Sequence, residues 1–170
     1  MSDSETETLC RATINQYLKD PLCKRLWPNL DINSICDADS AMRYIFMHGA
    51  CVDFANAISD STGWPIYEIQ WGDSMIDDPN DCQNLKGVHR VIRHPSGRYF
   101  DASGWTDMET VLGTFNAKGY SYKWMDEVDH GADIFNVDYA LIKSVVIYLM
   151  PEGCMEPHKV EGKSTSRMKM

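Results

Sequence analysis

The sequence predicts an α+β fold in which helices come first and antiparallel strands follow. Apolar residues recur at helical spacing up to Gly63, and beyond it they give way to runs rich in β-branched and aromatic residues. The chain has 170 residues, of which 44% are hydrophobic and 24% charged, as in ordinary globular proteins. This predicts one domain over residues 1–150 and a mobile basic tail over residues 151–170, where the periodicity is lost.

The helical part begins with SETETLCRATINQYLK, residues 4–19. Ser4 and Glu7 have the spacing of a capping box at the start of this helix. Residues 21–28 are bounded by prolines and predict a short irregular connection. A second helix is expected over residues 39–49, because Asp and Ser give a start signal and Gly gives a stop.

The third expected helix contains the run HGACVDFANAI, begins near Ala50 and ends at Gly63. Four of its residues follow the i, i+3, i+4, i+7 spacing of a core-facing side: Cys51, Phe54, Ala55 and Ile58. The polar residues Asp53, Asn56 and Asp60 are expected to point elsewhere. Cys51 therefore lies in the first turn of a helix and also on its apolar side.

Three strands are expected next, over residues 65–71, 85–94 and 97–105. The first two are separated by an acidic loop with many turn-forming residues. The run HPSG joins the second to the third, and its proline and glycine fit the usual three-residue hairpin loop. Beyond the strands, residues 106–120 predict a capped helix ending at Gly119. Residues 136–150 are compatible with either a helix or a strand.

The hairpin determines which side chains share a face. Counting outward from a loop over residues 95–97 places His89 opposite Ser103, and Asp101 lies two residues before Ser103. His89 and Asp101 then lie diagonally on one face, with Cβ atoms about 7 Å apart. A two-residue loop would place them on opposite faces, so this inference depends on the HPSG turn.

Together with Cys51, this face would supply the groups that nucleophilic catalysis needs. The positive end of a helix favours a thiolate, an imidazole accepts its proton, and a carboxylate orients the imidazole. The backbone N–H groups at the start of the helix, including that of Cys51, would face a developing oxyanion. The sequence thus predicts Cys51 as nucleophile, His89 as general base and Asp101 as orienting acid.

The order GACVDFANAI, then GVHRVIRHPSG, then RYFDASGW resembles the core of the transglutaminase-like and papain-like cysteine enzyme superfamily. Together with TGWPI, it is similar to small bacterial and phage proteins that carry this core. The resemblance covers about residues 45–105 and implies a nucleophile helix packed on a small antiparallel sheet. It also implies attack on an acyl carbon by a thiol protease, isopeptidase, amidase or acyltransferase. Papain-like members carry a glutamine shortly before the cysteine, and here the nearest upstream is Gln16, so the oxyanion hole stays unassigned.

Each member of the predicted triad also has a plain structural interpretation. Cys51 could be a buried apolar thiol, since free cysteine is among the most buried residue types. His89 could be a hydrogen-bonded strand histidine, and Asp101 could form the turn that follows it. A second function is accordingly a catalytically silent binding or inhibitor protein, of phage origin, that retains the fold.

The net charge and the cysteine pattern limit which binding partners and which cellular location we expect. A net charge of −9 argues against nucleic acid, and no segment is apolar enough for a membrane span. The N-terminus is acidic, unlike a signal peptide, and the six cysteines form no CxxC pair, which together predict a reduced, cytoplasmic protein. The expected partner is a protein or peptide substrate, with basic ones favoured by the acidic charge. The oligomeric state is left open.

We expect no cofactor and no metal. His48 and Cys51 could contribute to a zinc site, but a single HxxC is thin support for one. The acidic loop that contains Asp73 does not have the spacing of a calcium-binding loop, although it could form a rim that selects substrates. Trp105 follows the Asp101 segment closely and is the tryptophan expected to bind substrate beside the site.

Overall fold

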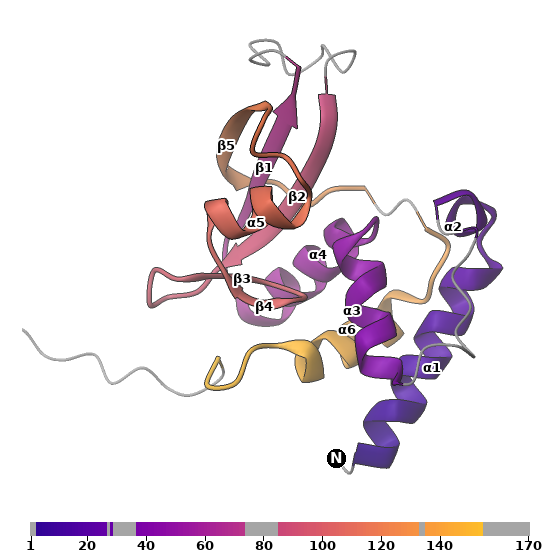
Figure 1. The fold of residues 1–170 in the computed structure, drawn as a ribbon. Coiled ribbons are helices and arrows are strands. Elements are labelled where there is room, and N and C mark those ends of the chain that lie inside the picture. Colours follow the sequence, from indigo (N-terminus) through magenta and orange to yellow (C-terminus); the bar gives the residue numbers. More distant parts are fainter. Residues whose placement is uncertain (1–2, 27, 29–36, 74–84, 133–134, 155–170) are drawn as a thin grey trace, which may run out of the picture.

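The structure is a computed structural model, and it describes residues 3–26, 28, 37–73, 85–132 and 135–154. In this part of the chain, six helices accompany one antiparallel sheet, which confirms the α+β class (Figure 1). The helices are α1 (Asp3–Lys19), α2 (Pro21–Leu26), α3 (Ala38–Met47), α4 (Cys51–Thr62), α5 (Met108–Thr114) and α6 (Tyr139–Leu149). None of these helices is both long and apolar enough to cross a membrane.

The sheet has five strands in the order β4-β3-β2-β1-β5. The strands are β1 (Ile66–Gly72), β2 (Leu85–Arg93), β3 (Tyr99–Asp101), β4 (Gly104–Thr106) and β5 (Ser121–Val128). Every neighbouring pair is antiparallel. The long central strands β1 and β2 therefore each have a neighbouring strand on both sides. Successive side chains along each strand point to opposite faces of the sheet.

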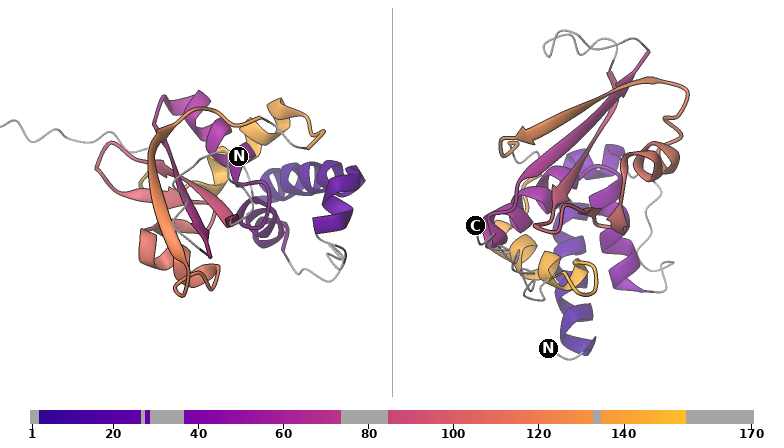
Figure 2. Two further views of the ribbon diagram at one scale, coloured as in Figure 1. Left: turned by 90° about the horizontal axis from the view of Figure 1, so that it is seen from above. Right: turned by 90° about the vertical axis from the view of Figure 1, so that its left-hand side faces the viewer.

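Each face of the sheet has its own hydrophobic cluster. Ile66, Ile92 and Phe100 pack with α1, α3, α4 and α6, while the alternate positions Tyr67 and Val91 pack with α5. Two further views agree that α5 lies across the sheet from the larger group of helices (Figure 2). The helix α4 lies directly against the sheet and contacts β1, β2 and β3.

Several element boundaries differ from the sequence predictions. The ambiguous segment over residues 136–150 is the helix α6, and the helix expected over residues 106–120 stops at Thr114. The strand β5 and the helix α2 are not predicted from the sequence at all. The strand expected over residues 97–105 is broken at residues 102–103, where the chain turns back so that β4 pairs with β3.

The burial of two polar residues on α4 also differs from the prediction. Asp53 and Asn56 are buried, although the helical pattern places them away from the core. The hydroxyl of Tyr17 on α1 donates a 2.6 Å hydrogen bond to Asp53 Oδ2. Burial of a carboxylate is tolerated where such a bond compensates for lost water. The helix α4 is thus buried on more than one side.

One residue of the predicted tail packs into the core. Cys154 is buried in the main hydrophobic cluster, and its carbonyl oxygen lies 3.0 Å from His94 Nε2. Cys154 therefore belongs to the packed part of the chain, and residues 155–170 of the predicted tail lie outside the described residues. The same holds for residues 74–84 of the acidic loop, whose remaining Asp73 forms a 2.8 Å ion pair with Lys86.

Candidate active site

Cys51 is the first residue of α4 and so lies in its first turn, which the sequence predicts. The preceding helix α3 ends with His48 as its C-cap, and residues 49–50 connect it to α4. Ala50, the N-cap of α4, offers no side-chain hydrogen bond to the first turn. The backbone N–H groups at this helix end are therefore not capped by a side chain of the N-cap residue and carry the positive end of the helix dipole.

The helix end is held in place by packing one turn further on. Phe54 lies against Phe46 of α3, with ring centroids 5.4 Å apart, and against Phe100 of β3 at 6.4 Å. All three rings are buried. Cys51 itself is 8% exposed, so it lies at the edge of this core and not at its centre.

The hairpin after β2 has the predicted loop. Gly97 adopts φ +85°, in the left-handed region, and its N–H donates a 2.8 Å hydrogen bond to the His94 carbonyl. The His94 N–H donates to the Arg98 carbonyl at 2.9 Å, which closes the three-residue loop. The pairing of Ile92 with Phe100 continues the same register. His89 and Asp101 consequently point to the same face of the sheet, and the register prediction is confirmed.

Asp101 forms the turn between β3 and β4 and also contacts the imidazole. Its Oδ1 accepts hydrogen bonds from the Ser103 N–H at 2.8 Å and the Ser103 hydroxyl at 2.6 Å. Its Oδ2 lies 2.9 Å from Nε2 of His89. Asp101 therefore has both roles that the sequence suggests. Its Oδ1 forms the turn with Ser103, and its Oδ2 contacts His89. The turn bonds fix the carboxylate in the orientation that meets His89.

His89 is almost fully buried and has distinct surroundings at its two ring nitrogens. Because a carboxylate only accepts, Nε2–H donates to Asp101, and this leaves Nδ1 as the basic nitrogen. Nδ1 is buried, and in the described part of the chain no group makes a well-formed hydrogen bond with it. Burial lowers the pKa of His89, but the hydrogen bond with Asp101 and the nearby Cys51 thiol outweigh this effect and raise the pKa from 6.5 to about 9. The structure thus brings all three predicted residues together.

The other described cysteines are in less reactive surroundings. Cys10, Cys23 and Cys154 are each at most 1% exposed. Burial raises the pKa of their thiols to about 11, 12 and 11 respectively. Since the thiolate is the nucleophilic form, these three thiols are poor nucleophiles at neutral pH.

Two elements of the site are joined by a side-chain clamp. On α4, Asn56 Nδ2 donates to the Gly131 carbonyl at 2.9 Å, and its Oδ1 accepts from the Gly131 N–H at 3.3 Å. On β2, Arg90 donates to the Asp129 carbonyl at 3.2 Å and to Glu68 at 2.8 Å. The segment after β5 therefore links the helix that carries Cys51 to the strand that carries His89.

Sequence reasoning did not single out Phe115, which lies beside the imidazole. Phe115 is the C-cap of α5, and its ring centroid is 4.9 Å from that of His89. His48 packs against the same phenyl ring at 5.7 Å. No local signal marks Phe115 as a site residue, because its position depends on where α5 packs on the sheet.

Trp105 is placed away from the triad. It pairs with Phe100 across β3 and β4, so it points to the opposite face from Asp101. Its ring lies near Phe100 at 5.7 Å and His94 at 5.4 Å, with the Arg98 guanidinium 3.9 Å from its centroid. Binding of substrate by Trp105 stays a prediction, and these ring contacts do not connect it with Cys51.

Metal binding was the rival interpretation of His48 and Cys51. In the described ranges, no three His, Cys, Asp or Glu side chains come together in a way that could hold a metal ion. His48 instead stacks on Tyr44, with centroids 4.3 Å apart.

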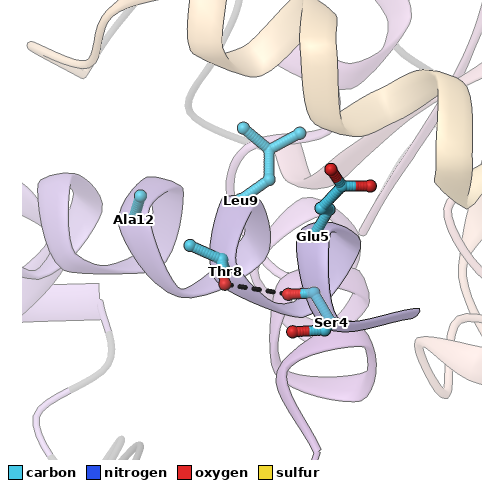
Figure 3. A pocket seen from close by; sticks show the side chains of 5 residues that line it. All are labelled: Ser4, Glu5, Thr8, Leu9 and Ala12. Atoms are coloured by element: carbon cyan, nitrogen blue, oxygen red, sulfur yellow. Dashed lines mark hydrogen bonds between the residues drawn. The ribbon is translucent and has the colours of Figure 1, made fainter. Parts of the chain in front are cut away.

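A hollow of about 340 Å³ lies on α1, on a different element from the triad (Figure 3). Its lining includes Ser4, Glu5, Thr8, Leu9 and Ala12, and the Thr8 hydroxyl donates to the Ser4 carbonyl at 2.8 Å. None of these five side chains is a strong nucleophile or an imidazole base, so the hollow offers no comparable chemistry.

Comparisons with protein-family models, with curated proteins and with solved structures found no match to this chain. A function for the chain therefore has to be argued from the geometry around Cys51.

Proposed function

We propose that this protein is a cysteine-dependent acyl-transfer enzyme with Cys51 as nucleophile, His89 as general base and Asp101 as orienting acid. The observation that carries the proposal is the buried hydrogen bond between His89 Nε2 and Asp101 Oδ2, at 2.9 Å, beside the thiol that begins α4. The packing of helix α4 against the antiparallel sheet supports the proposal of a papain-like or transglutaminase-like core.

The first half of the reaction uses both nitrogens of His89. Because the pKa of His89 is raised to about 9, the imidazole is the protonated partner at neutral pH: Nδ1 holds the proton taken from the Cys51 thiol, while Nε2–H keeps its hydrogen bond to Asp101. The thiolate attacks the acyl carbon, and the carbonyl electron pair moves to oxygen. When the tetrahedral intermediate collapses, the bond to the leaving group breaks and Nδ1–H protonates that group. The product is a thioester on Cys51 and a neutral His89.

The second half reverses these roles. His89 Nδ1 takes a proton from water or from an amine, which attacks the thioester carbon. Collapse of the second intermediate breaks the carbon–sulfur bond, and the thiolate recovers its proton from Nδ1. Water as acceptor gives hydrolysis, and an amine gives transfer.

Charge on the tetrahedral oxygen needs donors that are already in place. The first turn of α4 supplies backbone N–H groups, among them that of Cys51, at a helix end without a side-chain N-cap bond. This assignment replaces the glutamine of papain-like members with main-chain donors. We further propose a protein or peptide substrate and a cytoplasmic location, which suits the four free thiols of the described residues.

An acylation experiment tests the proposal. The protein is treated with p-nitrophenyl acetate, and the acetyl group is located by peptide mass spectrometry together with the burst of p-nitrophenol. We expect acetyl transfer to Cys51, slowed about a hundredfold or more in a His89→Ala variant. The buried Cys10, Cys23 and Cys154 serve as internal controls with poor thiolate character.

A matched control removes a different imidazole. His130 lies outside the triad, with Asp60 as its 3.5 Å partner, so His130→Ala should leave acylation of Cys51 unchanged. Equal acylation of Cys51 in the wild-type and His89→Ala proteins, with folding retained by circular dichroism, would sink the proposal.

A further inference from the structure

Four rings form a connected series beside the imidazole of the triad. Tyr44 lies 4.3 Å from His48, and His48 lies 5.7 Å from Phe115, centroid to centroid. Phe115 in turn stacks on Trp71 at 5.3 Å with an interplanar angle of 25°, and it lies 4.9 Å from His89. We name Tyr44, His48, Phe115 and Trp71 the aromatic wall.

Exposure increases along the aromatic wall, away from its buried end. Trp71 is 6% exposed, Phe115 is half-buried, and His48 and Tyr44 are exposed. Phe115 packs against both hydrophobic clusters, so it lies at the seam between the two faces of the sheet. The wall therefore runs from solvent to the edge of the candidate site.

Two rings of the aromatic wall closely precede the nucleophile in the chain. Tyr44 is in the last turn of α3, and His48 is the C-cap of that helix. Two residues separate His48 from Cys51. Because the four rings pack on one another and His48 directly precedes the turn into α4, this packing positions the wall relative to the thiol.

The chemistry of the wall favours an apolar partner. The wall contains no carboxylate, and partial desolvation of the His48 ring together with the charge of His89 lowers the pKa of His48 below 6.5, which favours its neutral form at pH 7. Faces and edges of neutral rings attract other rings in offset or edge-to-face geometry. A charged group placed there would lose water without gaining a counter-ion from the wall.

We propose that the aromatic wall binds an aromatic side chain of the substrate next to the acyl carbon that Cys51 attacks. This inference rests on the proposed acyl-transfer function and narrows its substrates to acyl compounds, such as peptides, that carry a ring beside the scissile bond. It differs from the basic substrates that the net charge of −9 favours.

The test uses acetyl-capped chloromethyl ketones that differ in one side chain, that of Phe, Ala, Lys or Glu. The second-order rate of Cys51 alkylation is measured for each by mass spectrometry. We expect the Phe compound to react about tenfold faster than the Ala compound, and faster than the Lys and Glu compounds. Equal rates for Phe and Ala, or a faster Lys compound, would overturn the inference.

Variants identify the surface responsible. Tyr44→Ala removes a ring that is 45% exposed, and Phe115→Leu keeps apolar bulk without a ring. Both should bring the ratio of Phe to Ala rates towards one. Tyr148→Ala on α6 removes a tyrosine of similar exposure, 42%, outside the wall and should leave the ratio unchanged. A ratio that survives in Tyr44→Ala and Phe115→Leu contradicts the inference.

Iodoacetamide separates the two proposals, because it is too small to reach both the thiol and the wall. If His89→Ala slows its reaction with Cys51 but the Phe and Ala ketones react alike, only the aromatic subsite is wrong. If iodoacetamide reacts with Cys51 independently of His89, the proposed function fails, and the subsite inference fails with it.

Discussion

The raised pKa of His89 gives a quantitative prediction about Asp101. A folded-state pKa of about 9 against the ordinary 6.5 corresponds to about 3 kcal/mol, at about 1.4 kcal/mol per pKa unit. Because the pKa is raised on folding, this stability is fully present below pH 6.5. It is lost as the pH rises from 6.5 through about 9.

Asp101→Asn removes the negative partner and keeps the shape of the side chain. Burial still lowers the pKa of His89, and the carboxylate that raised it is gone. We therefore expect the pKa of His89 to fall well below its wild-type value. Cys51 also raises the pKa and stays in the variant, so between pH 6 and pH 9 the wild-type protein should lose up to about 3 kcal/mol more of its free energy of unfolding than the variant.

Two measurements check this prediction. The ring protons of His89 are titrated by NMR, and urea unfolding is measured at pH 6 and pH 9 for both proteins. Ser103→Ala is the control, because it removes a hydrogen bond to Oδ1 and leaves the Oδ2 contact with His89. The reasoning is refuted if His89 titrates at the same pH in the wild type and in Asp101→Asn.

Two further predictions concern the packing around the site. Tyr17→Phe removes the 2.6 Å hydrogen bond to buried Asp53 and should lower the free energy of unfolding in urea by about 1.5–3 kcal/mol; an unchanged value would mean that this bond adds no stability. Gly87→Ala would place a Cβ 2.2 Å from the Trp71 ring and should cost about 1–3 kcal/mol, whereas Gly119→Ala, with open space around it, should be nearly neutral in the same thermal-melting assay. Equal melting temperatures for the two alanine variants would contradict the close packing of Trp71.

Much of the candidate site could be predicted because its decisive contacts are local. The HPSG loop needs a left-handed residue, and Gly97 supplies it at φ +85°, as Gly63 does at φ +72° at the end of α4. Once the loop length is fixed, the alternation of side chains places His89 and Asp101 on one face whatever the rest of the chain does. The short hairpin therefore encodes the buried 2.9 Å hydrogen bond between them.

Other features have no comparable local signal. The strand β5 pairs with β1, from which it is separated by the whole hairpin and α5, so its sequence alone does not reveal a partner. The burial of Asp53 depends on Tyr17, 36 residues away in sequence, which compensates for a polar group on α4. The turn at residues 102–103 depends on β4 finding β3 as well as on local preference.

The sequence by itself determined the α+β class, the position of Cys51 in the first turn of α4 and the register that joins His89 to Asp101, because caps, turns and strand alternation act over a few residues. Only the tertiary structure decided that the thiol meets the imidazole, that Phe115 and His48 lie beside it, and that Trp105 points to the other face. These outcomes depend on how helices pack on the two faces of the sheet, and packing between distant segments leaves no periodic pattern in the chain.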